Sequence, residues 1–239
     1  MSTVAFGDCR LGFADRACHL PAADAVVVAD LHLGRTAGPD VAWPLDGRER
    51  DDLRARLGRA LDRFSPATVV FAGDLLHRFG DASARATAGL DALAGACRDA
   101  GARPVLVAGN HDAVLGRAWD GVVHDEYRLA DGTVVGHGHE EPTADAPRYV
   151  VGHDHPVIRI EGRRRPCLLY GPGVYRGRDL LVLPAFTALA RGVAVHGMRA
   201  DDFDSPLVRD ADALRPVVHD PDADEALAFP PLGRFRGLL

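Results

Sequence analysis

The 239-residue sequence contains no lysine, so every basic side chain other than histidine is an arginine. We interpret this as the compositional bias of a GC-rich genome and attach no function to it. The net charge is −6, so the chain has no global basic field that would hold nucleic acid. This net charge weakens the case for a nucleic-acid partner but does not exclude one, because a local basic groove can lie on an acidic protein.

Cysteine is scarce, and its four positions, Cys9, Cys18, Cys97 and Cys167, form no C-x-x-C motif. This argues against a zinc or disulfide framework and predicts small, buried or half-buried thiols. No run reaches about 18 consecutive apolar residues, so we expect no transmembrane helix. The N-terminus lacks the charged start and long apolar run of a signal peptide, so we expect a cytoplasmic protein.

The remaining composition is typical of a globular protein, with 47% hydrophobic and 26% charged residues. We find no polar linker and therefore expect a single domain over residues 1–239. Residues 199–239 are rich in aspartate and proline, and we expect them to wrap the surface as a C-terminal extension.

Five apolar runs are each followed by residues that bind metals. The runs are Ala25–Ala29, Thr68–Ala72, Pro104–Ala108, Thr133–Val135 and Tyr149–Val151. They lead into Asp30-Leu31-His32, Gly73-Asp74, Gly109-Asn110-His111-Asp112, Gly136-His137-Gly138-His139 and Gly152-His153-Asp154-His155. Continuously apolar runs suit strands covered on both faces, and functional loops lie at the carboxyl ends of parallel strands. We therefore expect the five clusters to converge on one site.

Two helices are expected between the first three strands. Asp46 can cap a helix whose apolar face holds Leu53, Leu57, Leu61 and Phe64. A second helix follows residues 81–83 and carries Leu90, Leu93, Ala94 and Cys97 on one stripe, with Gly101 as its C-cap. This β-α-β-α-β order predicts neighbouring parallel strands.

The rest of the chain predicts shorter, closely spaced strands. One or two edge strands are expected within residues 1–24. Beyond residue 113, Asp131-Gly132 and Glu161-Gly162 are turn signals between apolar runs. We therefore expect antiparallel strands to follow the parallel half.

The ligand types indicate a two-metal site. Asp30 and His32 are two residues apart, as are His153 and His155, and in an extended segment this spacing points both side chains the same way. Asp74 follows a glycine, as a carboxylate shared by two ions would. Oxygen and nitrogen ligands favour zinc, iron, manganese or nickel. Two ions about 3.5–4 Å apart can bind phosphate oxygens and activate a bridging water as hydroxide.

The ordered motifs resemble those of the calcineurin-like metallophosphoesterase superfamily over residues 26–156. Three stretches resemble the small archaeal and bacterial branch related to repair nucleases and sometimes found near DNA ligases: Asp30-Leu31-His32-Leu33-Gly34, Gly73-Asp74-Leu75-Leu76-His77 and Gly152-His153-Asp154-His155-Pro156. The resemblance implies an α/β fold, a four-layer α-β-β-α sandwich of two mixed β-sheets flanked by helices.

The resemblance also implies roles for individual residues. The first metal would be held by Asp30, His32, Asp74 and His155, and the second by Asp74, Asn110, His137 and His153. His111 would contact the phosphate and protonate the leaving group, and Asp112 would orient His111 or raise its pKa. The cofactors would be two divalent ions, with manganese as the first choice and iron or zinc as alternatives.

Several alternatives remain open from the sequence. His139 could replace His137 as the ligand, and His77 could reach the site or lie on its rim. Arg163–Arg165 could be a solvated hairpin tip or a phosphate-binding patch, to which Arg176 and Arg178 would add. The expected substrate is a phosphodiester in a nucleotide or nucleic acid. The second hypothesis is an enzyme that hydrolyses a small phosphomonoester. The third is a catalytically silent, metal-bearing binding module.

Overall fold

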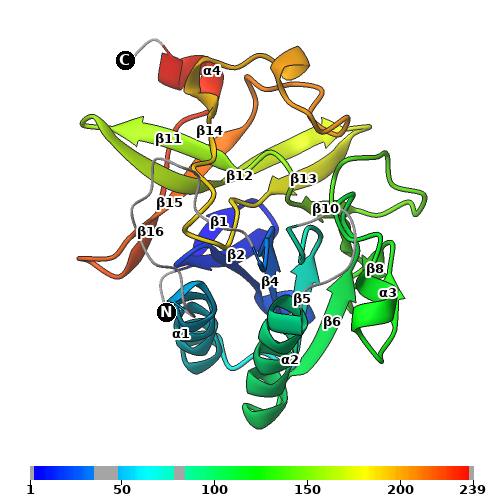
Figure 1. The fold of residues 1–239 in the computed structure, drawn as a ribbon. Coiled ribbons are helices and arrows are strands. Elements are labelled where there is room, and N and C mark those ends of the chain that lie inside the picture. Colours follow the sequence, from blue (N-terminus) through cyan, green and yellow to red (C-terminus); the bar gives the residue numbers. More distant parts are fainter. Residues whose placement is uncertain (1–2, 35–47, 78–83, 237–239) are drawn as a thin grey trace.

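Two β-sheets packed face to face form the centre of the protein (Figure 1). The computed structural model describes residues 3–34, 48–77 and 84–236. Asp46 and residues 81–83, which the sequence places at the starts of the two helices, lie outside these ranges.

The first sheet contains seven strands in chain order. They are β1 (Val4–Phe6), β2 (Cys9–Ala14), β3 (Ala17–Leu20), β4 (Ala25–Ala29), β5 (Thr68–Ala72), β6 (Arg103–Val107) and β7 (Val123–His124). The short 3-10 helix η1 (Pro21–Ala23) joins β3 to β4. The strands from β4 to β7 are parallel, as the sequence predicts. The N-terminal region adds three antiparallel strands, where the sequence suggested one or two.

Helices α1 (Arg48–Phe64), α2 (Ala84–Asp99) and α3 (Leu115–Ala118) accompany the first sheet. In Figure 1, α1 and α2 lie on the face turned away from the second sheet. Strand β4 is buried on both sides: Val26 and Val28 pack in the cluster that contains the helices, whereas Val27 and Ala29 pack between the sheets. The continuous apolar run is therefore explained by two buried faces.

The second sheet is mixed. Its main order is β14 (Val193–Ala194), β11 (Pro156–Ile160), β12 (Arg163–Tyr175), β13 (Arg178–Val182), β10 (Arg148–Val151), β9 (Val134–Val135) and β8 (Tyr127–Arg128). The antiparallel prediction is wrong for β9–β10, β10–β13 and β11–β14, which are parallel. The turns at Asp131-Gly132 and Glu161-Gly162 are confirmed, because they connect the antiparallel pairs β8–β9 and β11–β12.

The C-terminal part contributes to two layers. Phe203, Leu207, Leu214 and Leu232 pack on the outer face of the second sheet. This covering layer holds η2 (Val195–Gly197), η3 (Ala200–Asp202) and α4 (Leu232–Phe235), so its helices are short. The chain also adds β15 (Arg215–Asp220), which pairs with β12, and β16 (Glu225–Ala228), which pairs with β15. The α/β sandwich of two mixed sheets is confirmed.

The four cysteines are free and buried, as expected. No helix within the described residues is long and apolar enough to cross a membrane. The cytoplasmic location stays a prediction.

Gly101 ends α2 as the sequence predicts. Its φ is +80°, its N–H donates to the Arg98 carbonyl at 2.9 Å, and the next N–H, of Ala102, donates to the Cys97 carbonyl at 2.8 Å. These two bonds form a Schellman motif, in which a left-handed residue favours glycine.

We predict that Gly101→Ala lowers the free energy of unfolding by about 1 kcal/mol, because a Cβ is strained at this φ. Gly95→Ala, inside the same helix and with open space for a Cβ, should raise it by roughly 0.5–1 kcal/mol. Denaturant unfolding of both variants checks the prediction. Equal effects of the two substitutions would contradict it.

Candidate metal centre

The candidate ligands lie where the carboxyl ends of strands from both sheets meet. Asp30 and His32 follow β4, Asp74 follows β5 and Asn110 lies three residues after β6. His137 follows β9, and His153 and His155 follow β10. Backbone bonds hold these loops together: His32 N–H donates to the Asp74 carbonyl at 2.8 Å, and Gly152 N–H donates to the His137 carbonyl at 2.9 Å.

Within the described residues, two groups of three side chains converge closely enough to hold an ion. One is Asp30, His32 and His155, and the other is Asp30, Asp74 and His137, with the ligand atoms of each group within 4.8 Å of one another. Asp30 is common to both groups. The resemblance instead assigns the shared position to Asp74, whose Oδ1 lies 3.5 Å from His137 Nε2.

The contacts between these side chains fit a bound cation. His32 Nε2 lies 3.4 Å from His155 Nε2, His153 Nδ1 lies 3.1 Å from His137 Nε2, and Asn110 Oδ1 lies 3.0 Å from the same nitrogen. Metal–nitrogen bonds of about 2.0–2.1 Å place neighbouring ligand atoms roughly 3.0–3.4 Å apart. Asp30 Oδ1 and His137 Nδ1 are buried, lie 3.5 Å apart and have no hydrogen-bond partner in the described part of the chain.

The burial and the pKa shifts of these side chains also favour a bound cation. Asp30 and Asp74 are 0% and 3% exposed. Burial and then the charge of Asp30 raise the pKa of Asp74 to about 7. Burial also raises the pKa of Asp30, but His155, His137 and His32 together bring it below its ordinary value. Burial lowers the pKa of His137 to about 4, which keeps its imidazole neutral, the form that binds metals.

The ligand loops have an unusual backbone. Asp30, His32, Asp74, His153 and His155 all have φ between +44° and +71°. Such values are uncommon outside glycine, although aspartate and histidine are enriched among the exceptions. A left-handed residue bends the chain sharply, so the backbone changes direction at these positions after each strand. Strain of this kind clusters at functional sites.

His111 lies at the edge of the cluster. Its backbone N–H donates to Asp74 Oδ1 at 3.1 Å, its Nε2 lies 3.8 Å from Asp74 Oδ2, and its side chain is 30% exposed. This ring can therefore meet a substrate from the solvent side while staying next to the ligands.

Asp112 is buried and contacts the backbone. Its carboxylate accepts N–H groups from Leu75 at 3.0 Å, Leu76 at 2.9 Å and Gly109 at 2.8 Å. These bonds clamp the loop after β5 to the loop after β6. The ring of His111 is not among the partners of this carboxylate within the described residues.

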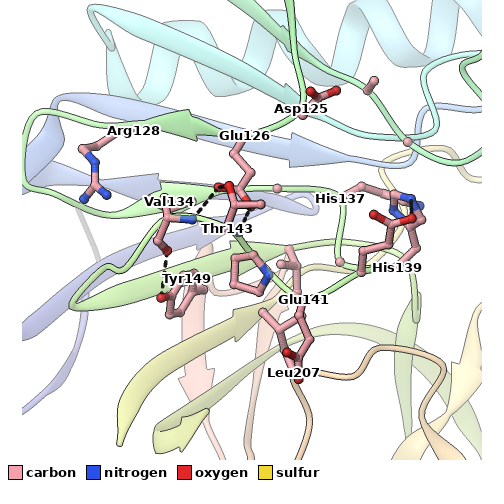
Figure 2. A pocket seen from close by; sticks show the side chains of 18 residues that line it. Asp125, Glu126, Arg128, Val134, His137, His139, Glu141, Thr143, Tyr149 and Leu207 are labelled. Carbon is pink, nitrogen blue, oxygen red and sulfur yellow. Dashed lines mark hydrogen bonds and ion pairs between the residues drawn. The ribbon is translucent and has the colours of Figure 1, made fainter. Parts of the chain in front are cut away.

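His137 and His139 occupy different places. His137 is buried among the other candidate ligands, whereas the His139 side chain is 32% exposed and lies 3.6 Å from Glu140. Both line a cavity of about 580 Å³ next to the centre (Figure 2). His77 lies near the centre too, with its ring 5.7 Å from that of His32.

One residue of the site was missed in the sequence. Asp154 is buried, and its Oδ1 accepts the Asp204 N–H at 2.8 Å, which ties the outer layer to the loop between two candidate ligands. Asn110, which the sequence analysis already names as a candidate ligand, is the single asparagine of a chain without glutamine.

Gly109 allows the loops after β5 and β6 to approach closely, because a Cβ there would lie 2.3 Å from both the backbone nitrogen and Oδ1 of Asp74. We predict that Gly109→Ala displaces Asp74 and reduces metal binding. Gly136→Ala is the matched control, since a Cβ at that position meets nothing within 4 Å. Metal content of the two purified variants checks this, and equal occupancy would contradict it.

Comparisons with known proteins agree with this geometry. The family model of calcineurin-like phosphoesterases matches residues 24–181. The chain is similar to the crystal structure of Pseudomonas putida nuclease MPE, with 25% identity, a TM-score of 0.63, and coverage of 95% of this chain and 98% of that one. It also matches Yfce, a phosphoesterase from E. coli, with 14% identity, a TM-score of 0.43, and coverage of 87% and 98%. No curated protein matches. The chain belongs to the calcineurin-like phosphoesterase family and is a metal-dependent hydrolase of phosphate esters.

Proposed function

We propose that this protein hydrolyses phosphodiester bonds in nucleic acid or nucleotides, with two divalent ions held by Asp30, His32, Asp74, Asn110, His137, His153 and His155. The convergence of these side chains from both sheets carries the proposal. When bound, the two ions would supply an activated water and neutralise phosphate oxygens. Manganese is our first choice for both, with iron or zinc as alternatives.

The choice of a phosphodiester is supported by the similarity to a nuclease over nearly the full length of both chains. In this proposal His111 contacts the phosphate and donates a proton to the leaving oxygen, since its side chain is partly exposed beside Asp74. Asp112 keeps the loop that carries His111 against the loop that carries Asp74.

We predict that His111→Ala lowers kcat by roughly 10²–10⁴-fold, the usual contribution of a general acid, while the bound metal is retained. The measurement is manganese-dependent hydrolysis of bis(p-nitrophenyl) phosphate beside p-nitrophenyl phosphate, after chelation and reloading. The diester should be the better substrate. His219→Ala is the control, because His219 pairs with Asp224 outside the site. A preference for the monoester would replace the diester proposal, and full activity of His111→Ala would remove His111 from the mechanism.

The shared carboxylate can be identified by metal stoichiometry. We predict that Asp74→Asn loses both ions, because a shared ligand serves two sites, whereas Asp30→Asn loses mainly one. Asp125→Asn, an exposed carboxylate at the neighbouring cavity, should keep both. Elemental analysis of the three proteins checks this. The reverse order of loss would make Asp30 the shared ligand, as the two groups around Asp30 suggest.

A further inference from the structure

The arginines of the β11–β12 hairpin are divided between its two faces. Arg159 lies directly opposite Arg164 across the two strands, so their side chains leave the same face. Arg163 and Arg165 lie opposite Ile160 and Ile158, on the other face. The run Arg163–Arg165 is therefore not a single patch, because neighbouring residues of a strand point to opposite sides.

Hydrogen bonds connect the side of the hairpin that carries Arg164 to the segment of His155. Arg164 donates to the carbonyls of Arg191 at 3.0 Å and Gly192 at 2.8 Å. The next N–H along the chain, of Val193, donates to the His155 carbonyl at 2.9 Å. Strand β11 itself begins directly after His155. One candidate ligand thus lies at the start of this basic surface, which we define as Arg159, Arg164 and Arg191.

The basic surface is not neutralised. All three side chains belong to exposed residues, and within the described ranges none forms an ion pair with a carboxylate. Arg176 and Arg209, by contrast, both pair with Glu141. An uncompensated basic cluster on a protein with a net charge of −6 attracts anions locally.

The opposite end of the second sheet carries the other sign of charge. The cavity beside His137 and His139 is lined by Asp125, Glu126, Glu140 and Glu141, with Arg128 as its basic side chain (Figure 2). These residues lie on or beside β8 and β9, whereas the basic surface lies on β11, β12 and the segment before β14. In Figure 1 the two regions are at opposite ends of the sheet. Among the described residues, the charges therefore favour successive phosphates on the side of the metal centre that carries the basic surface.

We propose that Arg159, Arg164 and Arg191 bind the phosphate backbone of a nucleic-acid strand that extends from the metal centre along β11 and β14, away from the acidic cavity. This inference rests on the proposed function and narrows its substrate to a polynucleotide. Contacts of this kind position a strand without reading its sequence. Arg164 also holds the segment before β14, so Arg159 and Arg191 are the positions to vary.

The test is binding of a fluorescent single-stranded oligonucleotide of mixed sequence, followed by anisotropy at several salt concentrations in EDTA, which prevents cleavage. The variant is Arg159→Gln with Arg191→Gln. We expect a roughly tenfold loss of affinity at low salt and a decrease of about 1.4 in the slope of log affinity against log salt, at about 0.7 per lost phosphate contact. Hydrolysis of bis(p-nitrophenyl) phosphate should keep its wild-type kcat/KM, because this small diester does not reach the basic surface.

Arg54→Gln with Arg98→Gln is the matched control. It changes the net charge equally at two exposed arginines of α1 and α2 that form no ion pair within the described residues. An equal loss of affinity in both double variants would overturn the proposal, because the effect would then follow net charge. Wild-type protein without salt-sensitive binding would overturn it as well. The wild-type protein could also cleave neither the diester nor the monoester while binding is lost only in the Arg159 and Arg191 variant. That result would refute the proposed catalysis and support nucleic-acid binding by the basic surface.

Discussion

The burial of two neighbouring carboxylates is the constraint on which this structure depends. Asp30 and Asp74 are nearly inaccessible to solvent, and their proximity, added to burial, raises the pKa of Asp74 to about 7. Buried charges are tolerated when they are paired or coordinate metals. The surrounding imidazoles compensate part of the negative charge, and the proposed divalent cations would compensate the remainder. The close loops, the clamp made by Asp112 and the left-handed backbone all keep these carboxylates together.

Much of the first sheet could be predicted because its strands and helices are indicated by short, continuous stretches of the sequence. β4 is continuously apolar, β5 and β6 are apolar after their first residue, and the helices between them have clear apolar faces, so parallel strands followed directly. The pairing within the second sheet could not be predicted in the same way. Strands β9, β10 and β13 are short and come from distant segments, and their parallel pairing is set by packing between the sheets. The pairing of β15 with β12 could not be predicted either, because it joins distant segments of the chain. In the sequence, Val217 of β15 does not differ from the other apolar residues of the C-terminal region.

For the site, the sequence predicted which loops meet but not how their backbones turn. The two-residue spacing of Asp30 and His32 suggested an extended segment, whereas both residues are left-handed. Side-chain identity alone does not distinguish these conformations, since aspartate and histidine adopt either. Asp112 shows the same limit: the family resemblance implied that it orients His111 or raises its pKa, and only the fold shows three backbone donors around its carboxylate.

The proposed ligands are divided between the two sheets, which has a consequence for stability. Asp30, Asp74 and Asn110 belong to loops of the first sheet, and His137, His153 and His155 belong to loops of the second. A cation bound by both sets acts as a cross-link through the sandwich, which the unfolded chain cannot reproduce. Folding and metal uptake are then thermodynamically linked, and a metal at 100 times its dissociation constant adds about 2.7 kcal/mol to the free energy of unfolding. With these ligands, the thermal stability of the protein would depend on the concentration of free metal around it.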